Sequence, residues 1–239
     1  MHSEQVQIGG LRTVLLGRQD APKCVVILCH GYGASGDDLV GIGENILSQL
    51  PELAESTLWA FPEAPLSLDG MYGRAWWELN VEALLSAVAS GDFASMEEAT
   101  PPGIALARSE VTNLVEHLVA KCGISHDQLV LGGFSQGAMI STDVALHLEQ
   151  KPGLLVVFSG ALICRDSWSV LAAKEPKLRV LQSHGEIDPV LAPGMGAALS
   201  RLLEENGHDL EFHSFMGGHT IPVQAMQALA MKVHSIVSD

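Results

Sequence analysis

Short apolar runs alternate along the chain with stretches whose apolar positions recur every three or four residues. The runs predict β-strands at Gln5–Ile8, Leu11–Leu16, Lys23–Cys29, Thr57–Phe61, Gln128–Phe134, Leu154–Phe158, Leu178–Ser183 and Leu210–Phe215. The periodic stretches predict helices at Ile104–Lys121, Ser135–Glu149, Pro193–Asn206 and Ile221–Ser238. Gly9-Gly10 separates the first two runs and predicts a hairpin. Strands that alternate with helices are typical of βαβ units, so we expect a mostly parallel, twisted sheet with helices on both faces.

No proline-rich or serine-rich linker divides the 239 residues, so we expect one domain spanning residues 1–239. The segment Leu79–Thr100 is surplus to a minimal arrangement of strands and helices. It mixes an apolar stripe with acidic residues, and it lies between a strand and the helix that should follow. We expect it to be a surface helix packed by that stripe, or alternatively a lid near the active site.

The composition excludes several classes of protein. Hydrophobic residues make up 47% of the chain and charged residues only 17%, which argues against disorder. Acidic residues outnumber basic ones by 28 to 13, for a net charge of −15. Binding of nucleic acid needs a basic surface, and anionic membranes would repel this chain. We therefore expect no nucleic-acid partner.

Four cysteines are present, without C-x-x-C spacing: Cys24, Cys29, Cys122 and Cys164. They are too few for a disulfide scaffold in a chain of this length, so free thiols are expected. The N-terminal residues MHSEQVQIGG have neither the basic nor the apolar region of a signal peptide. No apolar run reaches the ~18 residues that span a bilayer, so no stable membrane insertion is expected. These features together predict a cytoplasmic protein.

The strongest motif is GGFSQGA at residues 132–138, which contains G-x-S-x-G at Gly133, Ser135 and Gly137. It lies between a predicted buried strand and a predicted helix, which is the setting of a nucleophile elbow. Small residues allow the sharp turn to close, and the helix N-terminus directs positive partial charge at the site. The motif predicts Ser135 as a nucleophile. The alternative is a glycine-rich turn with an incidental serine.

A serine nucleophile needs a base, and ten histidines are available. We predict His219, because it lies in Gly217-Gly218-His219 after the last strand, at the sheet edge where Ser135 also lies. His30 and His184 also follow strands, and we expect them to bond loop backbone. A metal site formed by His208, His213 and His219 is an alternative, but its spacing matches no zinc signature.

The base in turn needs an acid that orients its ring. Asp188 follows the strand predicted at Leu178–Ser183, with Glu186 close by, and Asp166 is a second candidate after Leu154–Phe158. We favour Asp188, because Pro189 restricts it to extended geometry. Ser, Asp and His then occur in the chain order of α/β-hydrolases.

Two backbone amides should stabilise the oxyanion. One belongs to Gln136, which follows the nucleophile, and we assign the other to Tyr32 in His30-Gly31-Tyr32-Gly33. The same loop matches the dinucleotide-binding pattern G-x-G-x-x-G. The acidic residue that would hold a ribose, Glu63, lies beyond a proline, so this alternative is disfavoured.

These motifs occur in the order found in one known family. HGYG at residues 30–33, FPEAP, GMYGRAWW, GGFSQGA, HGEIDP and GGHT resemble the phospholipase/carboxylesterase family of α/β-hydrolases, from about Pro22 to Val237. The resemblance implies a single-domain α/β-hydrolase fold, a Ser135–Asp188–His219 triad and an oxyanion hole at Tyr32 and Gln136. It also implies hydrolysis of esters or thioesters without metal or cofactor.

We therefore expect a serine carboxylesterase that acts on small-molecule esters with short to medium acyl chains. An apolar acyl wall is assigned to Trp76, Trp77, Met71 and Leu66, with ordinary core packing as the alternative for the tryptophans. The Trp76-Trp77-Glu78 sequence and the long Leu79–Thr100 segment depart from the acyl-protein thioesterases. Acyl-protein thioesterase or lysophospholipase activity is one alternative, and a non-catalytic binding module is another. A homodimer is left open.

Overall fold

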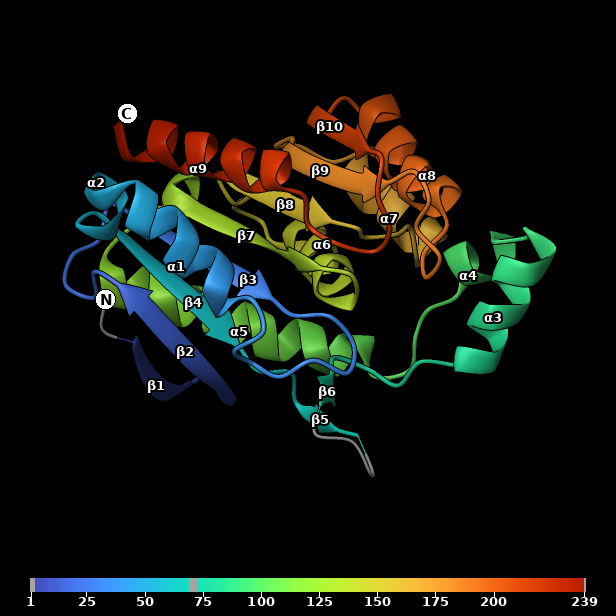
Figure 1. The fold of residues 1–239 in the computed structure, drawn as a ribbon, viewed down its shortest axis with the longest axis horizontal. Helices are drawn as coiled ribbons and strands as arrows, with labels where there is room; N and C mark the ends of the chain where they lie inside the picture. Colours follow the sequence, from blue (N-terminus) through green and yellow to red (C-terminus); the bar gives the residue numbers. More distant parts are fainter. Residues whose placement is uncertain (1–2, 69–72, 239) are drawn as a thin grey trace.

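Within residues 3–68 and 73–238, which the computed structural model describes, the short strands β5 (Leu66–Ser67) and β6 (Arg74–Ala75) form a separate pair, and eight other strands form one twisted sheet (Figure 1). Its strands, in spatial order, are β1 (Ser3–Ile8), β2 (Leu11–Gly17), β4 (Thr57–Pro62), β3 (Cys24–Cys29), β7 (Leu129–Phe134), β8 (Leu154–Phe158), β9 (Arg179–Gly185) and β10 (Asp209–Phe215). β2 pairs antiparallel with both β1 and β4, and the remaining pairs are parallel. The predicted hairpin and the mostly parallel sheet are confirmed.

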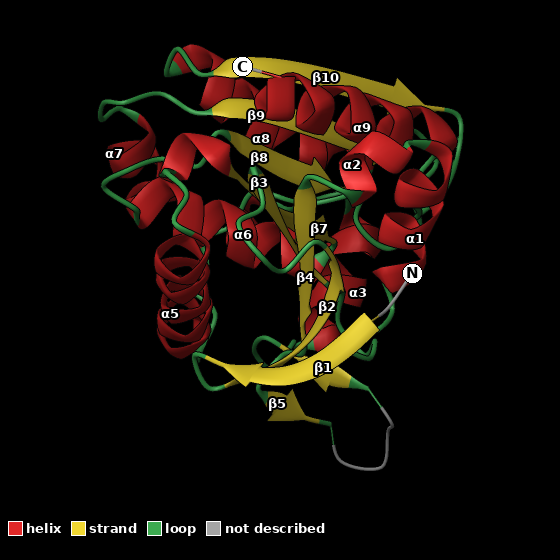
Figure 2. Cartoon of the chain, turned by 90° about the vertical axis from the view of Figure 1, so that its left-hand side faces the viewer, coloured by secondary structure: helices red, strands yellow, loops and turns green. Residues whose placement is uncertain are grey.

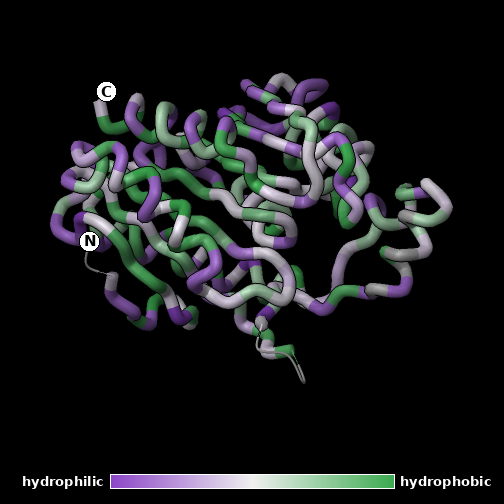
Figure 3. The backbone as a smooth tube through the Cα atoms, in the orientation of Figure 1, coloured by the Kyte–Doolittle hydropathy of each residue, from purple (hydrophilic) through white to green (hydrophobic). Residues whose placement is uncertain are grey.

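The central strands are buried on both faces. All six residues of β3 and all six of β4 are buried, as the continuous apolar runs predict. Figure 3 shows these strands as predominantly hydrophobic. The edge strand β10 instead alternates between exposed and half-buried residues.

Helices cover both faces of the sheet (Figure 2). One face carries α5 (Ile104–Cys122), α6 (Gln136–His147), α7 (Arg165–Ala172) and α8 (Pro193–Glu205), whose apolar side chains join one core cluster. The other carries α1 (Val40–Gln49), α2 (Pro51–Ala54) and α9 (Val223–Ser238), which form a second cluster. The sheet separates the two clusters. Because β4, β3, β7, β8, β9 and β10 run parallel, their carboxyl ends lie at the same edge of the sheet.

Three helices were not predicted from the sequence: α1, α2 and α7. Two glycines in VGIGENILSQ lower the helix propensity of α1, and RDSWSVLA opens α7 with polar residues. Both helices form because tertiary packing buries a few large side chains, including Ile46, Leu47 and Trp168.

The segment Leu79–Thr100 forms two short helices, α3 (Val81–Ser90) and α4 (Ala94–Glu98), in place of the one expected. They project from the body on the side where the parallel strands end (Figure 1). Leu79, Leu84, Phe93 and Met96 pack half-buried against the core. An ion pair from Glu97 to Arg165 attaches α4 to the first residue of α7.

All four cysteines are free and buried, as expected. Burial raises the pKa of the Cys24 and Cys29 thiols to about 12, so both stay protonated near neutral pH. None of the helices in the described residues is long and apolar enough to cross a membrane.

Candidate active site

The turn from β7 into α6 carries Ser135 in a conformation that few non-glycine residues adopt. Its φ is 55° and its ψ is −119°, and its amide donates to the Phe158 carbonyl at 2.9 Å. Strain of this kind costs about 1–3 kcal/mol and is found where a side chain must be presented at a functional site. The chain therefore has the geometry of a nucleophile elbow at the predicted serine.

Glycines on both sides of Ser135 allow this turn to pack against β3. A Cβ at Gly133 would lie 2.3 Å from the Cys29 carbonyl oxygen, and one at Gly137 would lie 2.0 Å from the same atom. Any side chain there would have to displace the backbone of β3. The G-x-S-x-G spacing is thus explained by the close approach of two neighbouring strands and a helix.

The predicted base and acid are hydrogen-bonded to each other. His219 Nδ1 lies 2.7 Å from Asp188 Oδ2, and the Asp188 side chain is fully buried while that of His219 is 15% exposed. A carboxylate only accepts, so Nδ1 carries the proton and Nε2 of the neutral ring is free to accept one. The tautomer is the one that a general base requires.

The other Asp188 oxygen is bound by its own loop. Oδ1 accepts the amides of Val190 at 2.8 Å and Leu191 at 2.9 Å. Burial by itself would raise the pKa of Asp188, but the hydrogen bonds from His219 and these two amides together hold it below its ordinary value. The carboxylate is therefore ionised at neutral pH and fixed in orientation.

Phe134, the residue before Ser135, has its ring against the ring of His219. The Phe134 and His219 rings lie 4.7 Å apart between centroids. The loop that carries His219 is also bound nearby, because Ser159 Oγ donates to the Thr220 carbonyl at 3.3 Å. Ser159 follows β8, and the predicted site residues Ser135, Asp188 and His219 follow β7, β9 and β10 at the same edge of the sheet.

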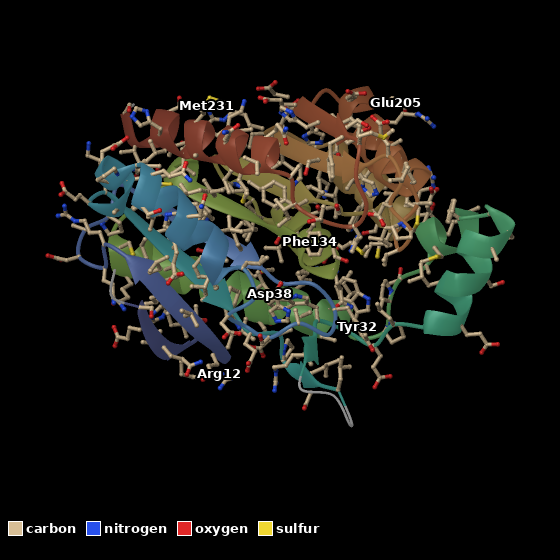
Figure 4. The ribbon with its side chains drawn as sticks, viewed as in Figure 1. Arg12, Tyr32, Asp38, Phe134, Glu205 and Met231 are labelled. Atoms are coloured by element: carbon tan, nitrogen blue, oxygen red, sulfur yellow. The ribbon has the colours of Figure 1, made fainter. Side chains whose placement is uncertain are left out.

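The two predicted oxyanion donors lie in this same region. Gln136 is the first residue of α6, where helical amides have no partner one turn earlier. Tyr32 and Phe134 both lie at the carboxyl end of the strands (Figure 4), and a Cβ at Gly31 would be 3.3 Å from Ser135 Cβ. The loop after β3 is thus in contact with the elbow.

Two backbone bonds hold the loop that carries Tyr32. The Gly33 amide donates to the Arg74 carbonyl, and the Arg74 amide donates to the Ala34 carbonyl, each at 2.9 Å. Arg74 belongs to β6 (Arg74–Ala75), which pairs with β5 (Leu66–Ser67). These bonds fix the loop directly after Tyr32, which helps to preorganise the donor.

The Gln136 side chain has a role that sequence reasoning missed. Its Oε1 accepts the Trp76 amide at 2.9 Å and its Nε2 donates to the Trp77 carbonyl at 2.8 Å. The residue after the nucleophile is therefore fixed to the segment that follows β6. A buried glutamine directly after a nucleophilic serine was the only signal, because the partners lie about 60 positions away.

The structure places the predicted acyl wall differently from our expectation. Trp76 and Trp77 are each only 1% exposed and belong to the hydrophobic core, so they present no surface to an acyl chain. Trp76 Nε1 instead donates to the His30 carbonyl at 2.9 Å. The alternative of ordinary core packing is therefore the correct one for both. Leu66 is half-buried on β5, and Met71 lies outside the described residues.

Three other histidines, His30, His208 and His213, form hydrogen bonds with neighbouring groups of the chain. His30 Nε2 accepts the Ala64 amide at 3.0 Å, and Nδ1 then donates to the Gly31 carbonyl at 2.8 Å. Burial lowers the pKa of His30, which keeps the ring neutral. His208 Nδ1 accepts the Leu178 amide, whereas His213 contacts Glu211. No cluster with metal-ligand character occurs among the described residues, and the alternative metal site is not formed.

The dinucleotide alternative fails at its acidic residue. Glu63 pairs with Arg12 and lies 3.4 Å from Arg74, so it does not project toward a ribose. A Cβ at Gly36, the last glycine of the pattern, would lie 2.7 Å from the Glu63 side chain. Gly31 and Gly36 instead pack the loop closely against Ser135 and Glu63.

Known proteins resemble this chain over most of its length. A family model described as Phospholipase/Carboxylesterase matches residues 13–236. Acyl-protein thioesterase 1 of Kluyveromyces lactis is 28% identical over 219 residues, which cover 87% of this chain and 89% of that protein. The crystal structure of esterase PE8 is 26% identical with a TM-score of 0.78, covering 95% of this chain and 99% of that one. The carboxylesterase from Mesorhizobium loti has a TM-score of 0.76 at 16% identity, covering 98% and 99%, and it shows the fold alone.

Proposed function

Because the chain belongs to the phospholipase/carboxylesterase family of α/β-hydrolases, we propose that it is a serine carboxylesterase that works through an acyl-enzyme on Ser135. The observation that carries the proposal is the 2.7 Å hydrogen bond from His219 to Asp188, next to a serine held at φ 55° on a strand-to-helix turn. A binding module without catalytic function would have no use for a strained serine and an oriented imidazole.

The reaction follows from the roles of these groups. His219 Nε2 removes the hydroxyl proton of Ser135 as Oγ attacks the ester carbonyl, and the amides of Gln136 and Tyr32 stabilise the oxyanion. His219 then returns the proton to the leaving alcohol or thiol, and the ester bond breaks. Water attacks the acyl-enzyme in the same manner and releases the acid. Asp188 stabilises the imidazolium in both steps.

The preferred substrate is a neutral ester with a short or medium acyl chain. Ile187, Val190 and Met216 expose apolar side chains on the two loops that carry Asp188 and His219. Exposed apolar side chains on these loops favour an apolar acyl group, while the net charge of −15 disfavours anionic substrates. Thioesters are the second candidate, because the similar Kluyveromyces lactis protein is an acyl-protein thioesterase.

Chain-length profiling tests the substrate class. We expect kcat/KM to be highest for p-nitrophenyl esters of about four to eight carbons, with the butyrate preferred at least about tenfold over the palmitate, since only a limited apolar surface borders the site. Hydrolysis of the series is followed by p-nitrophenol release, with a palmitoylated peptide thioester as the competing substrate. A clear preference for the palmitoyl thioester over the butyrate would contradict this prediction.

The pH dependence tests the base. A histidine base acts only when neutral, and histidines ordinarily titrate near pH ~6.5, so kcat/KM should rise from about pH 6 to a plateau above about pH 7.5. Hydrogen bonds hold the pKa of Asp188 below its ordinary value, so this carboxylate stays ionised throughout the window and does not cause the rise. Initial rates in buffers of constant ionic strength measure the profile. An activity that increases as the pH falls below 6 is incompatible with a histidine base.

A further inference from the structure

His184 is a buried histidine beside the active site that takes no part in the chemistry described so far. It lies at the end of β9, is 2% exposed, and its Nε2 is 2.9 Å from the Leu191 carbonyl oxygen. Its Nδ1 is buried and has no hydrogen-bond partner within the described residues. A buried polar ring with one unpartnered nitrogen costs folding free energy, so its retention needs a reason.

The one hydrogen bond that the His184 ring forms defines its tautomer. A carbonyl oxygen only accepts, so Nε2 carries the proton and donates to Leu191. The neutral ring then leaves Nδ1 without a hydrogen. His184 therefore acts as a donor through one atom, and that atom is directed at the loop that carries Asp188.

The donor atom of His184 contacts the Asp188 loop at two points. The residue whose carbonyl it binds, Leu191, gives its own amide to Asp188 Oδ1 at 2.9 Å. The same Nε2 lies 3.5 Å from Asp188 Oδ2, the oxygen that accepts from His219 Nδ1. The positive end of the N–H dipole thus faces the carboxylate, and the bond to Leu191 closes the turn from 188 to 191.

We propose that His184 is a positioning residue for the catalytic acid: it holds the 188–191 turn so that Asp188 Oδ2 is aimed at His219. This inference rests on the proposed esterase function, since it assigns a task only if Asp188 orients a catalytic base. Without the His184 donor, the Leu191 carbonyl would be buried and unpaired, and the turn would relax. A misplacement of about 1 Å in such a support can cost about 10²-fold in rate.

Gly196 packs closely against the opposite side of the His184 ring. A Cβ at Gly196 in α8 would lie 2.3 Å from His184 Nδ1 and 2.7 Å from Cγ, so only glycine leaves room for the imidazole. The Gly196 carbonyl also accepts from Gln182 Nε2 at 2.8 Å. Gly194, two residues earlier in the same helix, has open space around its Cβ position. A side chain at Gly196 would therefore perturb His184 sterically, and the same change at Gly194 is its matched control.

The first test separates the donor from the shape of the ring. His184→Phe keeps a planar side chain but has no donor, whereas His184→Gln places an amide nitrogen near the position of Nε2. We expect His184→Phe to lower kcat by about 10–100-fold with KM changed less than about threefold, and His184→Gln to recover kcat to within about fivefold of wild type. Steady-state kinetics with p-nitrophenyl butyrate measure both, and circular dichroism confirms folding.

The second test leaves His184 in place. Gly196→Ala should push the ring and lower kcat by a similar factor, while Gly194→Ala, with the same gain in helix propensity, should stay within about twofold of wild type. Combining Gly196→Ala with His184→Phe should cost little more than either alone, because both act on one contact. The comparison of Gly196→Ala with Gly194→Ala also tests the proposal if His184→Phe fails to fold.

Proton NMR tests whether the loss of kcat arises at the hydrogen bond between His219 and Asp188. The strongly hydrogen-bonded His219 Nδ1 proton should give a low-field proton resonance in wild type, which should broaden or shift in His184→Phe and return in His184→Gln. Full kcat in folded His184→Phe, or an unshifted resonance despite reduced kcat, would overturn the positioning role. Failure of the esterase proposal would look different, because wild type would then not hydrolyse p-nitrophenyl butyrate, or Ser135→Ala would hydrolyse it as fast as wild type.

Discussion

Replacing Ser135 by alanine is expected to lower kcat by at least about 10³-fold while leaving the fold intact. Only the hydroxyl group is lost, and alanine adopts the same turn as readily as serine does. The residual rate would come from the oxyanion donors and from substrate binding. Turnover of p-nitrophenyl butyrate measures the loss, and the melting temperature shows that the variant is folded.

Covalent labelling by a fluorophosphonate is a second test of Ser135 as the nucleophile. Mass spectrometry of the digested adduct should find Ser135 modified and no other serine. Two further serines that neighbour glycines serve as controls, since Ser159 is fully buried and Ser35 is bonded to Asp37. Ser35→Ala should behave as wild type. Full activity of Ser135→Ala, or a label on Ser35 or Ser159, would refute the nucleophile assignment.

Changing Asp188 to asparagine is expected to lower kcat by about 10²–10⁴-fold. Both Asp188 oxygens act as acceptors, Oδ1 for two loop amides and Oδ2 for His219. With its oxygen kept on those amides, an asparagine would direct its NH₂ group at His219 Nδ1. The ring would then take the tautomer whose Nε2 is protonated and cannot accept the serine proton. The change in kcat, at little change in melting temperature, measures the effect.

Two neighbouring acids provide controls for that experiment. Asp166 is exposed in the first turn of α7, and Glu186 accepts from Ser214 Oγ at 2.9 Å on the outer side of the loop. Neither contacts His219 in the hydrogen bonds of the described residues. Asp166→Asn and Glu186→Gln should therefore each change kcat by less than about tenfold. If Asp166→Asn were the crippling substitution and Asp188→Asn stayed active, the acid would have been assigned to the wrong strand.

Local patterns explain why the strands and the elbow could be predicted. A strand buried on both faces must be apolar throughout, so Cys24–Cys29 and Leu154–Phe158 are visible as uninterrupted runs. A sharp turn beneath a presented serine requires small residues at fixed offsets, and Gly133 and Gly137 supply them. Both constraints act between residues close in sequence, and so the sequence records them.

The helices α1 and α7 and the tryptophan pair show where local patterns fail. Trp76 and Trp77 follow a glycine-containing sequence and have the composition of an apolar wall, yet both side chains are buried in the hydrophobic core. Whether an aromatic ring faces the core or a ligand depends on which distant segment covers it. For Trp76 that segment includes His30 and Gln136. No periodicity near residue 76 carries this information.

By itself the sequence determined the family, the mostly parallel sheet and the chain order of Ser135, Asp188 and His219, because motif spacing and strand runs are local properties of a chain. The sequence favoured Asp188 over Asp166, and tertiary structure placed the buried Asp188 carboxylate on His219 while Asp166 is exposed in α7. Tertiary structure alone revealed that His184 contacts the loop of that acid, and that Glu97 pairs with Arg165 across 68 positions. Such contacts depend on strand order and helix packing, which join residues that no sequence interval relates.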